Sequence, residues 1–420
     1  MFSKSFIEKN KKLIVNKTRE KGINYVVFKV IKKLINFKTL IIYPFVFFMC
    51  LIIWLIKPLF FIRFGSLNAE KIGPFATNTE LDLCERENGI QSKISFNIYH
   101  PGPTSFVCNH QLLKMWKRIL KVYPVSKYFW NIMNTFSFGR KHIIKNNSRD
   151  IYGVFEKSPI HLTFTQDEIL QAKEDLLKMG LKDNEKYVLF LNRSERYLKE
   201  TLPHMNLIHN SFRNCPINDF LPAAEMLSSN GNTVIRAGHL VGDIMETKNP
   251  KIIEYDRGGF RTELLDIYLA ANCRYIVNSD SGYADIAEHN FRKPMVNVNF
   301  TQIEYIHSWS SRGLFTFRKY WLKSEKRFMK IKEMLESGAG RFHKVEDYEK
   351  KGIEIINNTP QEIKETVEEM EKRLNGEWKD NEEEKNLQEL FWNHFKASNL
   401  HGVIRARIGA KFLRDNKSLV

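Results

Sequence analysis

The stretch that decides the fold reads Tyr275-Ile-Val-Asn-Ser-Asp-Ser-Gly282-Tyr-Ala-Asp-Ile-Ala-Glu-His-Asn290-Phe-Arg-Lys-Pro294-Met-Val-Asn-Val-Asn-Phe300. Two short apolar runs enclose a polar turn and a helical segment, and this pattern predicts strand, turn, helix and a second strand. We expect Ser281 or Asp280 to cap a helix that begins near Gly282. Such a turn directs backbone N–H groups at one spot and predicts a phosphate or carboxylate site. An ordinary turn without a ligand is the alternative.

The chain before this stretch repeats the same alternation of strands and helices. Helices are predicted over residues 165–180, 218–228 and 262–271, and strands over residues 187–191 and 233–236. Strands that alternate with helices favour a doubly wound parallel sheet, and we expect this sheet in a domain spanning residues 181–375.

Basic and polar residues lie at or just after the ends of three of these predicted strands. They are Arg193, then Arg236 with Gly238, then the turn of Ser279, Asp280, Ser281 and Gly282. Because the carboxyl ends of parallel strands meet at one edge of a sheet, we expect these residues to converge there. Arginines beside a turn rich in N–H groups predict a diphosphate site. Neither GxGxxG nor GxxxxGK[ST] occurs, so a dinucleotide site and a P-loop are not supported.

A smaller α/β domain is expected over residues 59–180. Strands are predicted over residues 59–65, 94–99 and 105–108, and a helix over 109–120. Glu80, Asp82 and His110 each follow a predicted strand-to-helix junction, where open sheets place their ligands. They are the candidates for a catalytic acid or base, and helix capping or a solvated surface position is the alternative for each.

The N-terminal 58 residues have a different composition. The chain carries a net charge of +17, and residues 1–38 hold 11 Lys or Arg against 2 Asp or Glu. This basic arm reads as an amphipathic helix, and uncharged residues 39–56 follow it. Together they predict that this segment binds an anionic membrane surface and not nucleic acid. Since basic residues flank 39–56 on both sides, a monotopic insertion is expected, with a single-pass span or a buried core helix as alternatives.

The rest of the chain gives weaker signals. The five cysteines lack metal-ligand spacing, so we expect reduced thiols, a cytosolic compartment and no metal site. Residues 301–350 are aromatic and basic, which fits either an acceptor-side loop or ordinary packing. Helices are predicted over residues 359–374, 381–395 and 406–413. The last two lie in the segment 376–420, which we expect to return to the first domain.

Several short blocks resemble a family of bacterial glycosyltransferases, usually membrane-attached, from surface-polysaccharide gene sets. The blocks are Ile62-Arg-Phe-Gly65 with Ile72-Gly73 and Asn78-Thr-Glu80-Leu81; Arg213-Asn214 with Asp219-Phe-Leu-Pro-Ala223; Leu265-Asp-Ile-Tyr-Leu-Ala270; Phe291-Arg-Lys-Pro294 with Val298-Asn-Phe300; Asn358-Thr-Pro360; and Ala406-Arg-Ile-Gly409 with Phe412-Leu413. The turn at 279–282 is also similar in placement to the diphosphate-binding turn of heptosyltransferases. Pro74 departs from the family pattern, where His would follow Gly73.

The resemblance implies a GT-B fold, in which two Rossmann-like domains face a cleft. It implies a nucleotide-sugar donor as substrate, no separate cofactor, and a glycan or lipid-linked acceptor. Donor binding would fall to Arg193, Arg213, Arg236, Gly238 and the residues Ser279, Asp280, Ser281 and Gly282. The acceptor-side base would be Glu80, Asp82 or His110, although Pro74 weakens the assignment of a base to its loop.

The expected function is therefore transfer of a sugar at the cytoplasmic face of the cell membrane. Two alternatives remain at this point: a polyol-phosphate transferase that uses a CDP-alcohol, and a non-catalytic membrane scaffold of polysaccharide assembly. The sequence does not name the nucleotide, the sugar, the acceptor or the stereochemical outcome.

Overall fold

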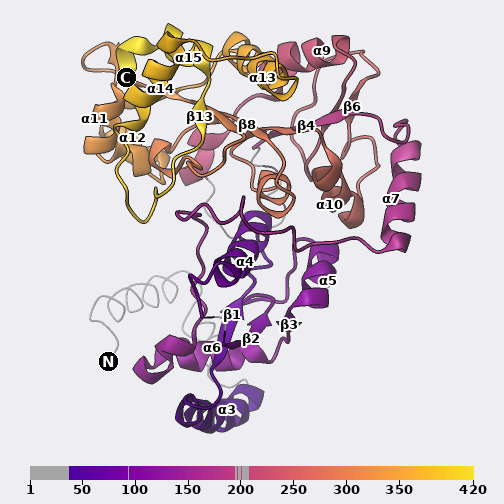
Figure 1. Ribbon diagram of the computed structural model, residues 1–420, viewed down its shortest axis with the longest axis vertical. Coiled ribbons are helices and arrows are strands. Elements are labelled where there is room, and N and C mark those ends of the chain that lie inside the picture. Colours follow the sequence, from indigo (N-terminus) through magenta and orange to yellow (C-terminus); the bar gives the residue numbers. More distant parts are fainter. Residues whose placement is uncertain (1–36, 93, 194–195, 197–199, 201–207) are drawn as a thin grey trace, which may run out of the picture. The chain divides into compact units, whose positions relative to one another are not determined.

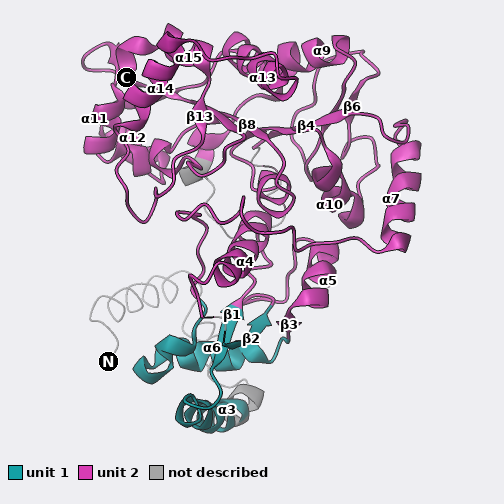
Figure 2. Cartoon of the chain, in the orientation of Figure 1, with its two compact units in different colours: residues 1–65, 94–100, 123–144 teal, residues 66–93, 101–122, 145–420 magenta. Residues whose placement is uncertain are grey.

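The computed structural model describes residues 37–420, except residues 93, 194–195, 197–199 and 201–207. The chain divides into two compact units (Figure 2). Unit 1 holds residues 1–65, 94–100 and 123–144, and unit 2 holds residues 66–93, 101–122 and 145–420. The predicted amphipathic arm lies outside the described residues. The predicted boundaries at residues 59, 181 and 376 stay predictions.

Unit 1 is a small α/β unit whose longest helix contributes to its core. Its elements are α3 (Phe37–Leu55), β1 (Ile62–Ser66), β2 (Phe96–His100), α6 (Ser126–Thr135) and the 3-10 helix η1 (Ser137–His142). The strands predicted near residues 59–65 and 94–99 are confirmed as β1 and β2, which are neighbours in a three-stranded sheet. In α3, Val46, Cys50 and Ile53 pack into a cluster with Phe64, Ile132 and Met133.

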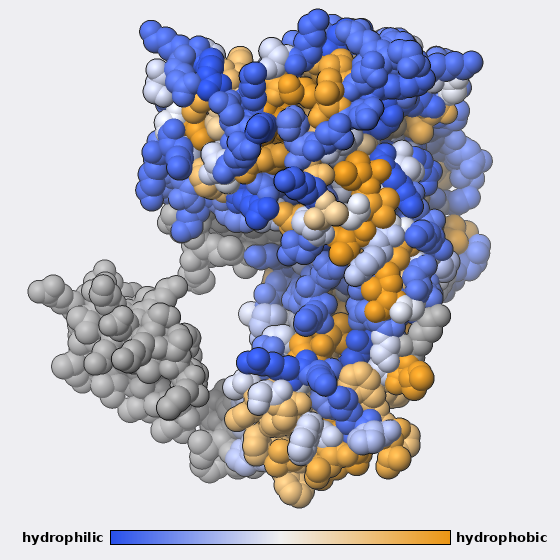
Figure 3. Space-filling view, turned by 60° about the vertical axis from the view of Figure 1, so that its left-hand side comes forward, coloured by the Kyte–Doolittle hydropathy of each residue, from blue (hydrophilic) through white to orange (hydrophobic). Residues whose placement is uncertain are grey.

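The other face of α3 is apolar and exposed. Phe45, Phe48 and Leu55 are 67%, 61% and 66% exposed. Figure 3 shows the hydrophobic residues gathered at the foot of the view. Within residues 37–420, the described helices include none that is long and apolar enough to cross a membrane.

Unit 2 is organised around a seven-stranded parallel sheet with the order β13-β9-β8-β7-β4-β5-β6 (Figure 1). Its strands are β4 (Tyr187–Asn192), β5 (Thr233–Arg236), β6 (Ile252–Glu254), β7 (Ile276–Ser279), β8 (Met295–Phe300), β9 (Gly313–Phe317) and β13 (Arg407–Ile408). Every pairing in it is parallel. The α/β class with a parallel sheet, predicted from the alternation of strands and helices, is confirmed.

Helices cover both faces of this sheet. On one face α9 (Leu221–Ser229) and α13 (Pro360–Leu374) pack against the fully buried residues Val188, Phe190 and Val277. On the other face lie α10 (Glu263–Asn272) and the π-helix η4 (Ile286–Asn290) (Figure 1). The central strands β7 and β8 are buried along their whole length, because a parallel sheet with two covered faces has no solvent side.

The remaining elements of unit 2 surround this core. They are α4 (Ile72–Glu87), α5 (His110–Ile119), β3 (Lys121–Val122), α7 (Gln166–Lys178), η2 (Ile208–Arg213), η3 (Ile217–Phe220), η5 (Ile303–Tyr305), β10 (Lys319–Leu322), β11 (Arg327–Phe328), α11 (Ile331–Glu336), η6 (Ala339–Arg341), α12 (Val345–Lys350), β12 (Ile353–Ile356), α14 (Glu382–Trp392), α15 (Ala410–Asp415) and η7 (Lys417–Leu419). Strands β10, β11 and β12 form a separate antiparallel sheet.

Three predictions about elements are corrected here. Residues 105–108 form no strand; Cys108 N–H donates to the carbonyl of Ala69 at 2.8 Å within an irregular segment that follows Pro101-Gly-Pro103. Residues 406–413 form the edge strand β13 followed by α15, where one helix was predicted. The helix α4 begins at Ile72, so the loop predicted for its first residues is helical.

Candidate functional site

Unit 2 contains a cavity of about 410 Å³ at the carboxyl ends of β4, β5 and β7. This volume lies within the range of small-molecule sites. Parallel pairing places Phe190 opposite Arg236 and Asn192 opposite Ser279, so the residues after these strands meet at one edge. The expected convergence at a sheet edge is therefore present, and Arg193, Arg213, Arg236, Gly238, Asp280, Ser281 and Gly282 line the cavity.

The first turn of α4 forms another wall of the same cavity. Lys71, Ile72, Gly73 and Pro74 all line it. The first N–H groups of a helix have no partner within the helix, and they carry the positive end of its dipole. Pro74 fits this first turn because a proline there removes an N–H that the helix does not need. The cavity thus combines a helix N-terminus with guanidinium groups, a combination suited to an anion.

The turn after β7 has a different construction from the one predicted. Asp280 adopts a left-handed conformation with φ 54°, and the side chain of Asn278 accepts a hydrogen bond from Ser281 N–H at 3.1 Å. Neither Ser281 nor Asp280 caps a helix at Gly282. The helical segment begins at Ala284 and continues as the π-helix η4, which lacks a side-chain cap.

Gly282 lies against the backbone of Gly73. A Cβ atom on Gly282 would lie 3.2 Å from the Gly73 nitrogen and 3.3 Å from its Cα. A Cβ atom on Gly73 would lie 2.8 Å from Oδ2 of Asp285. The two glycines therefore allow the turn after β7 and the start of α4 to touch, which shapes the cavity between them.

Arg236 is the most deeply buried cation of the cavity, with 1% of its surface exposed. Its Nη1 donates to the carbonyl of Ala237 at 2.7 Å, and its Nη2 donates to the side chain of Asn192. These partners are neutral, and no carboxylate among the described residues forms an ion pair with it. Burial lowers the pKa of Arg236 to about 10, against the attraction of Glu254 and other acidic groups. A buried guanidinium without an anion is costly, so this position favours an anionic ligand.

The other predicted donor-side residues have distinct positions. Arg213 donates to the carbonyl of Asp280 at 3.0 Å, and its Nε lies 3.4 Å from the Asp280 carboxylate. Arg193 N–H donates to the carbonyl of Ser279 at 3.1 Å, which joins β4 to the turn. Gly238 has φ +124°, a conformation that favours glycine, and it lies beside Arg236. Ser279 is fully buried and does not line the cavity, because its hydroxyl accepts from Cys215 Sγ at 3.2 Å.

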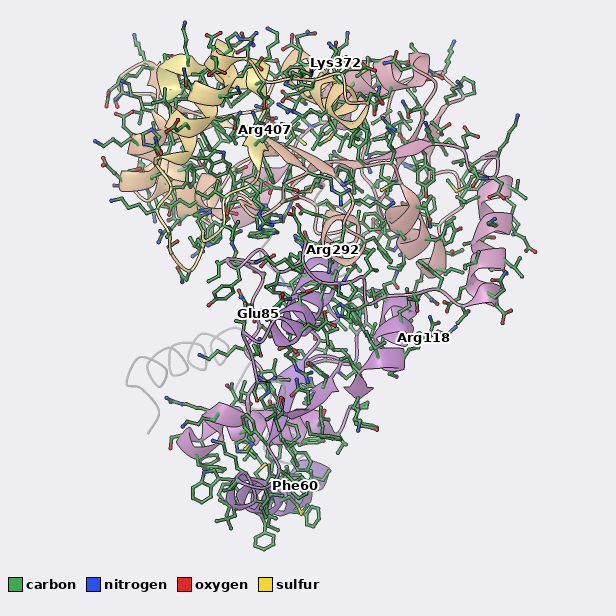
Figure 4. The ribbon with its side chains drawn as sticks, in the orientation of Figure 1. Phe60, Glu85, Arg118, Arg292, Lys372 and Arg407 are labelled. Atoms are coloured by element: carbon green, nitrogen blue, oxygen red, sulfur yellow. The ribbon has the colours of Figure 1, made fainter. Side chains whose placement is uncertain are left out.

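The three candidate bases lie outside the cavity lining. Glu80 is fully buried in the middle of α4, where it accepts from Arg292 at 2.6 Å and His161 at 2.9 Å. Figure 4 labels Arg292, which lies beside α4. Asp82 is also buried within α4. His110 begins α5, and its ring is 3.1 Å from the carboxylate of Glu263 in α10. Because α4 begins at Ile72, Glu80 and Asp82 lie in the body of a helix and not at a junction.

Three acidic residues of the cavity, Glu70, Asp266 and Asp285, were not singled out from the sequence. Asp285 lines it directly before the π-helix, and its side chain is 22% exposed. Asp266 pairs with Arg261 at 2.7 Å and accepts from the Tyr255 hydroxyl at 3.1 Å. Burial raises the pKa of Asp266 to about 7, although Arg261 and Tyr255 favour its charged form. The sequence could have indicated Asp285, because it lies one helical turn after Ser281. It gave no indication of Asp266, which lies in the middle of a predicted helix.

Comparison with known proteins gives structural likenesses only. No protein-family profile and no curated protein matches the chain. Among solved structures, a family 9 glycosyl transferase from Veillonella parvula DSM 2008 is similar, with 12% identity and a TM-score of 0.45, over 74% of this chain and 97% of that one. The ADP-heptose LPS heptosyltransferase II of E. coli is similar with 11% identity and a TM-score of 0.39, over 61% of this chain and 90% of that one.

Proposed function

We propose that this chain is a glycosyltransferase of GT-B type that binds a nucleotide-sugar in the cavity of unit 2. The observation that carries the proposal is Arg236, a buried guanidinium with only neutral partners at the edge of a parallel sheet. A diphosphate supplies the missing negative charge. The sequence blocks that resemble a glycosyltransferase family support a sugar as the transferred group.

The proposed reaction breaks the bond between the sugar and the diphosphate and forms a bond to an acceptor hydroxyl. Negative charge develops on the departing nucleoside diphosphate. Arg236, Arg193 and the N–H groups of Asp280 and Gly282 would stabilise it there without a metal ion at the phosphates. The first turn of α4, which touches this turn at Gly73, adds the positive end of a helix dipole.

The acceptor hydroxyl must also lose a proton, and Asp285 is our candidate for the group that takes it. Of the acidic residues of the cavity, Asp280 pairs with Arg213 and Asp266 pairs with Arg261. Glu70 also lines the cavity and accepts from Thr104 N–H at 2.9 Å. Among the described residues, Asp285 pairs with no lysine or arginine, and its nearest cationic partner is His289 at 3.9 Å, so we choose its carboxylate as the base. It replaces Glu80, Asp82 and His110 in this role because they do not line the cavity.

The acceptor and the location of the reaction form a second part of the proposal. The exposed aromatic face of α3 and the excess of basic residues in 1–38 support attachment to an anionic membrane. Since nucleotide-sugars are made in the cytosol, we place the enzyme at the cytoplasmic face of the cell membrane. A lipid-linked or glycan acceptor of surface-polysaccharide synthesis fits this location.

The donor can be tested by calorimetry and thermal shift with UDP-, GDP-, CMP- and CDP-linked sugars and with CDP-alcohols. One sugar donor should bind, and Arg236→Ala should weaken it by about 1.5–3 kcal/mol, the value of a charged hydrogen bond. Arg257→Ala is the matched control, because Arg257 is exposed and does not line the cavity.

Two outcomes would overturn the assignment. Equal donor affinity of Arg236→Ala and the unaltered protein would remove Arg236 from the site. Binding of a CDP-alcohol in place of every sugar donor would point to a polyol-phosphate transferase.

A further inference from the structure

A second group of polar side chains lies buried in unit 2 and has no part in the proposed donor site. Nε2 of His289 is 3.1 Å from Oε2 of Glu288, and Nδ1 of His307 is 2.9 Å from the same oxygen. The side chains of Glu288 and His289 are 3% and 2% exposed, and that of His307 is 19% exposed. One carboxylate and two imidazoles therefore converge on one buried spot, with donor atoms all within 4.8 Å of one another.

Some polar atoms of this group have no hydrogen-bond partner within the described part of the protein. Glu288 Oε1 and His289 Nε2 are buried and have no hydrogen-bond partner among the described residues. No lysine or arginine of the described part of the chain forms an ion pair with Glu288. A buried carboxylate in these surroundings needs a positive partner, which either a protonated imidazole or a metal ion held by both imidazoles would supply.

The neighbouring side chains hold the rings in fixed positions. Thr77 Oγ1 lies 2.8 Å from Nδ1 of His289, so a proton on Nδ1 would leave the lone pair of Nε2 free. A histidine that binds a metal almost always gives its second nitrogen to such a partner. Phe155 stacks on the ring of His289 with centroids 4.8 Å apart, and Trp309 stacks on His307 at the same distance.

The backbone at this spot is unusual as well. Glu288 and His289 lie in the π-helix at 286–290. Such segments are rare and are frequent at functional sites. The helix brings Glu288 and His289 opposite His307, which follows β8 and the short helix η5.

A second histidine–carboxylate cluster in unit 2 provides a contrast. Glu80, Cys84 and His161 also lie close together. There, however, Arg292 donates to Glu80 at 2.6 Å and lies 3.4 Å from the Cys84 sulfur, so a cation already occupies the centre. No arginine or lysine of the described residues occupies the corresponding place at Glu288.

We propose that Glu288, His289 and His307 bind a divalent transition metal, with Zn²⁺ as the best match. Imidazole and carboxylate are zinc ligands, and bond lengths near 2.1 Å place the donors of a tetrahedral site about 3.4 Å apart. Water would take the fourth position. The metal joins the π-helix to the segment that carries His307, and Asp285 directly precedes that helix. The metal therefore fixes the turn that forms one wall of the cavity.

The full-length protein, purified without chelators and then dialysed, should contain about one equivalent of Zn²⁺ by elemental analysis. The apoprotein titrated with Co²⁺ should develop the visible absorption of a four-coordinate site. Less than a tenth of an equivalent of metal, together with no absorption change and no thermal shift upon adding Zn²⁺ or Co²⁺, would overturn the proposal.

Variants locate the metal. His307→Gln, at the more exposed edge of the site, should lose the metal, whereas His161→Gln should retain it. Thr77→Val should weaken the affinity for Zn²⁺ by 10–100-fold while the site still fills at high metal concentration. Metal that is retained by His307→Gln and lost by His161→Gln would assign it to the other cluster and refute the proposal.

Discussion

Two buried arginines of unit 2 differ in how their charge is satisfied. Arg318 makes five hydrogen bonds: to the carbonyls of Phe212, Arg213 and Asn214, and to the side chains of Thr301 and Asn357. Its guanidinium is fully used in holding the segment that carries Arg213. Arg236 has fewer partners and faces the cavity. Burial alone therefore does not identify a ligand-binding arginine. Arg236 is identified by its guanidinium N–H groups that have no partner among the described residues.

The contact between Gly282 and Gly73 makes a specific prediction. Gly282→Val should push the turn and the start of α4 apart, because its Cβ would come within 3.3 Å of the Gly73 backbone. We expect donor affinity to fall at least tenfold and the free energy of unfolding to fall by about 1–3 kcal/mol. Calorimetry and urea unfolding measure the two effects. Gly102→Ala is the control, since its Cβ would meet nothing closer than 3.6 Å. Unchanged donor affinity of Gly282→Val would contradict the proposed role of this contact.

His161 gives the fold a predictable dependence on pH. Burial favours the neutral ring, but hydrogen bonds to Cys84 and Glu80 outweigh burial and raise the pKa of His161 to about 10. An unfolded histidine has a pKa of about 6.5. Protonated His161 therefore stabilises the folded state fully below about pH 6.5, and this stabilisation is lost as the pH rises through about 10.

The unaltered protein should thus lose about 2–4 kcal/mol more unfolding free energy than His161→Gln between pH 6.5 and 10.5. Urea unfolding at several pH values measures this difference. The exposed His343 serves as the control through His343→Gln. Parallel curves for the unaltered protein and His161→Gln would show that the ring is not protonated by these contacts.

The sequence predicted the positions of Arg193 and Arg236 at one sheet edge better than the positions of the candidate bases, for a physical reason. Arg193 and Arg236 follow strands whose apolar pattern marks where they end, and parallel pairing carries both to one edge. The place of Glu80 depends on where α4 begins, and Gly73-Pro74 reads equally well as a loop or as a first helical turn. The group at Glu288 depends on His307, which lies 19 residues further along the chain, beyond β8, and meets Glu288 only through tertiary packing.

At the scale of elements, α3 divides into two apolar faces with different surroundings. One face, with Val46, Cys50 and Ile53, is packed within unit 1, and the other, with Phe45 and Phe48, is exposed. Uniform hydrophobicity over residues 39–56 could not separate the two faces. The monotopic insertion stays a prediction, and the exposed face is the part of α3 that would enter the lipid.

Replacing Phe45, Phe48 and Leu55 by serine should weaken binding to vesicles of anionic lipid by tenfold or more. A large apolar side chain transferred from water contributes roughly 1.5–3 kcal/mol. Co-sedimentation measures the change. The control replaces Leu170 and Leu177 of α7, which are also exposed but belong to unit 2. Equal vesicle binding by the α3 variant and the unaltered protein would exclude this face as the membrane contact.

The edge strand β13 shows another limit of sequence patterns. Arg407 and Ile408 pair with Leu314 and Phe315 of β9, and Figure 4 labels Arg407. Two residues are too few for a strand pattern, and the apolar residues around them suit a helix as well. The partner that makes them a strand lies far back in the chain.

At the scale of the whole molecule, the division into units decides which truncation is informative. Removal of residues 1–36 should leave a folded protein that binds donor as the full chain does, with weaker binding to anionic vesicles. Removal of residues 1–56 should also strip α3 from the core of unit 1 and expose Phe64, Ile132 and Met133. We expect the longer truncation to aggregate in size-exclusion chromatography. Two truncations that are equally soluble and equally stable would show that α3 is dispensable for the unit.

The position of β13 has a consequence for synthesis on the ribosome. The outer edge of β9 forms its backbone hydrogen bonds with Arg407 and Ile408. These two residues are synthesised only after the whole segment from residue 318 onward. At roughly 5–20 residues per second, that edge stays unpaired for several seconds in every nascent chain. An unpaired strand edge is a template for association with other chains. During translation this protein therefore passes through a stage in which chaperone capture of the β9 edge competes with pairing between neighbouring nascent chains.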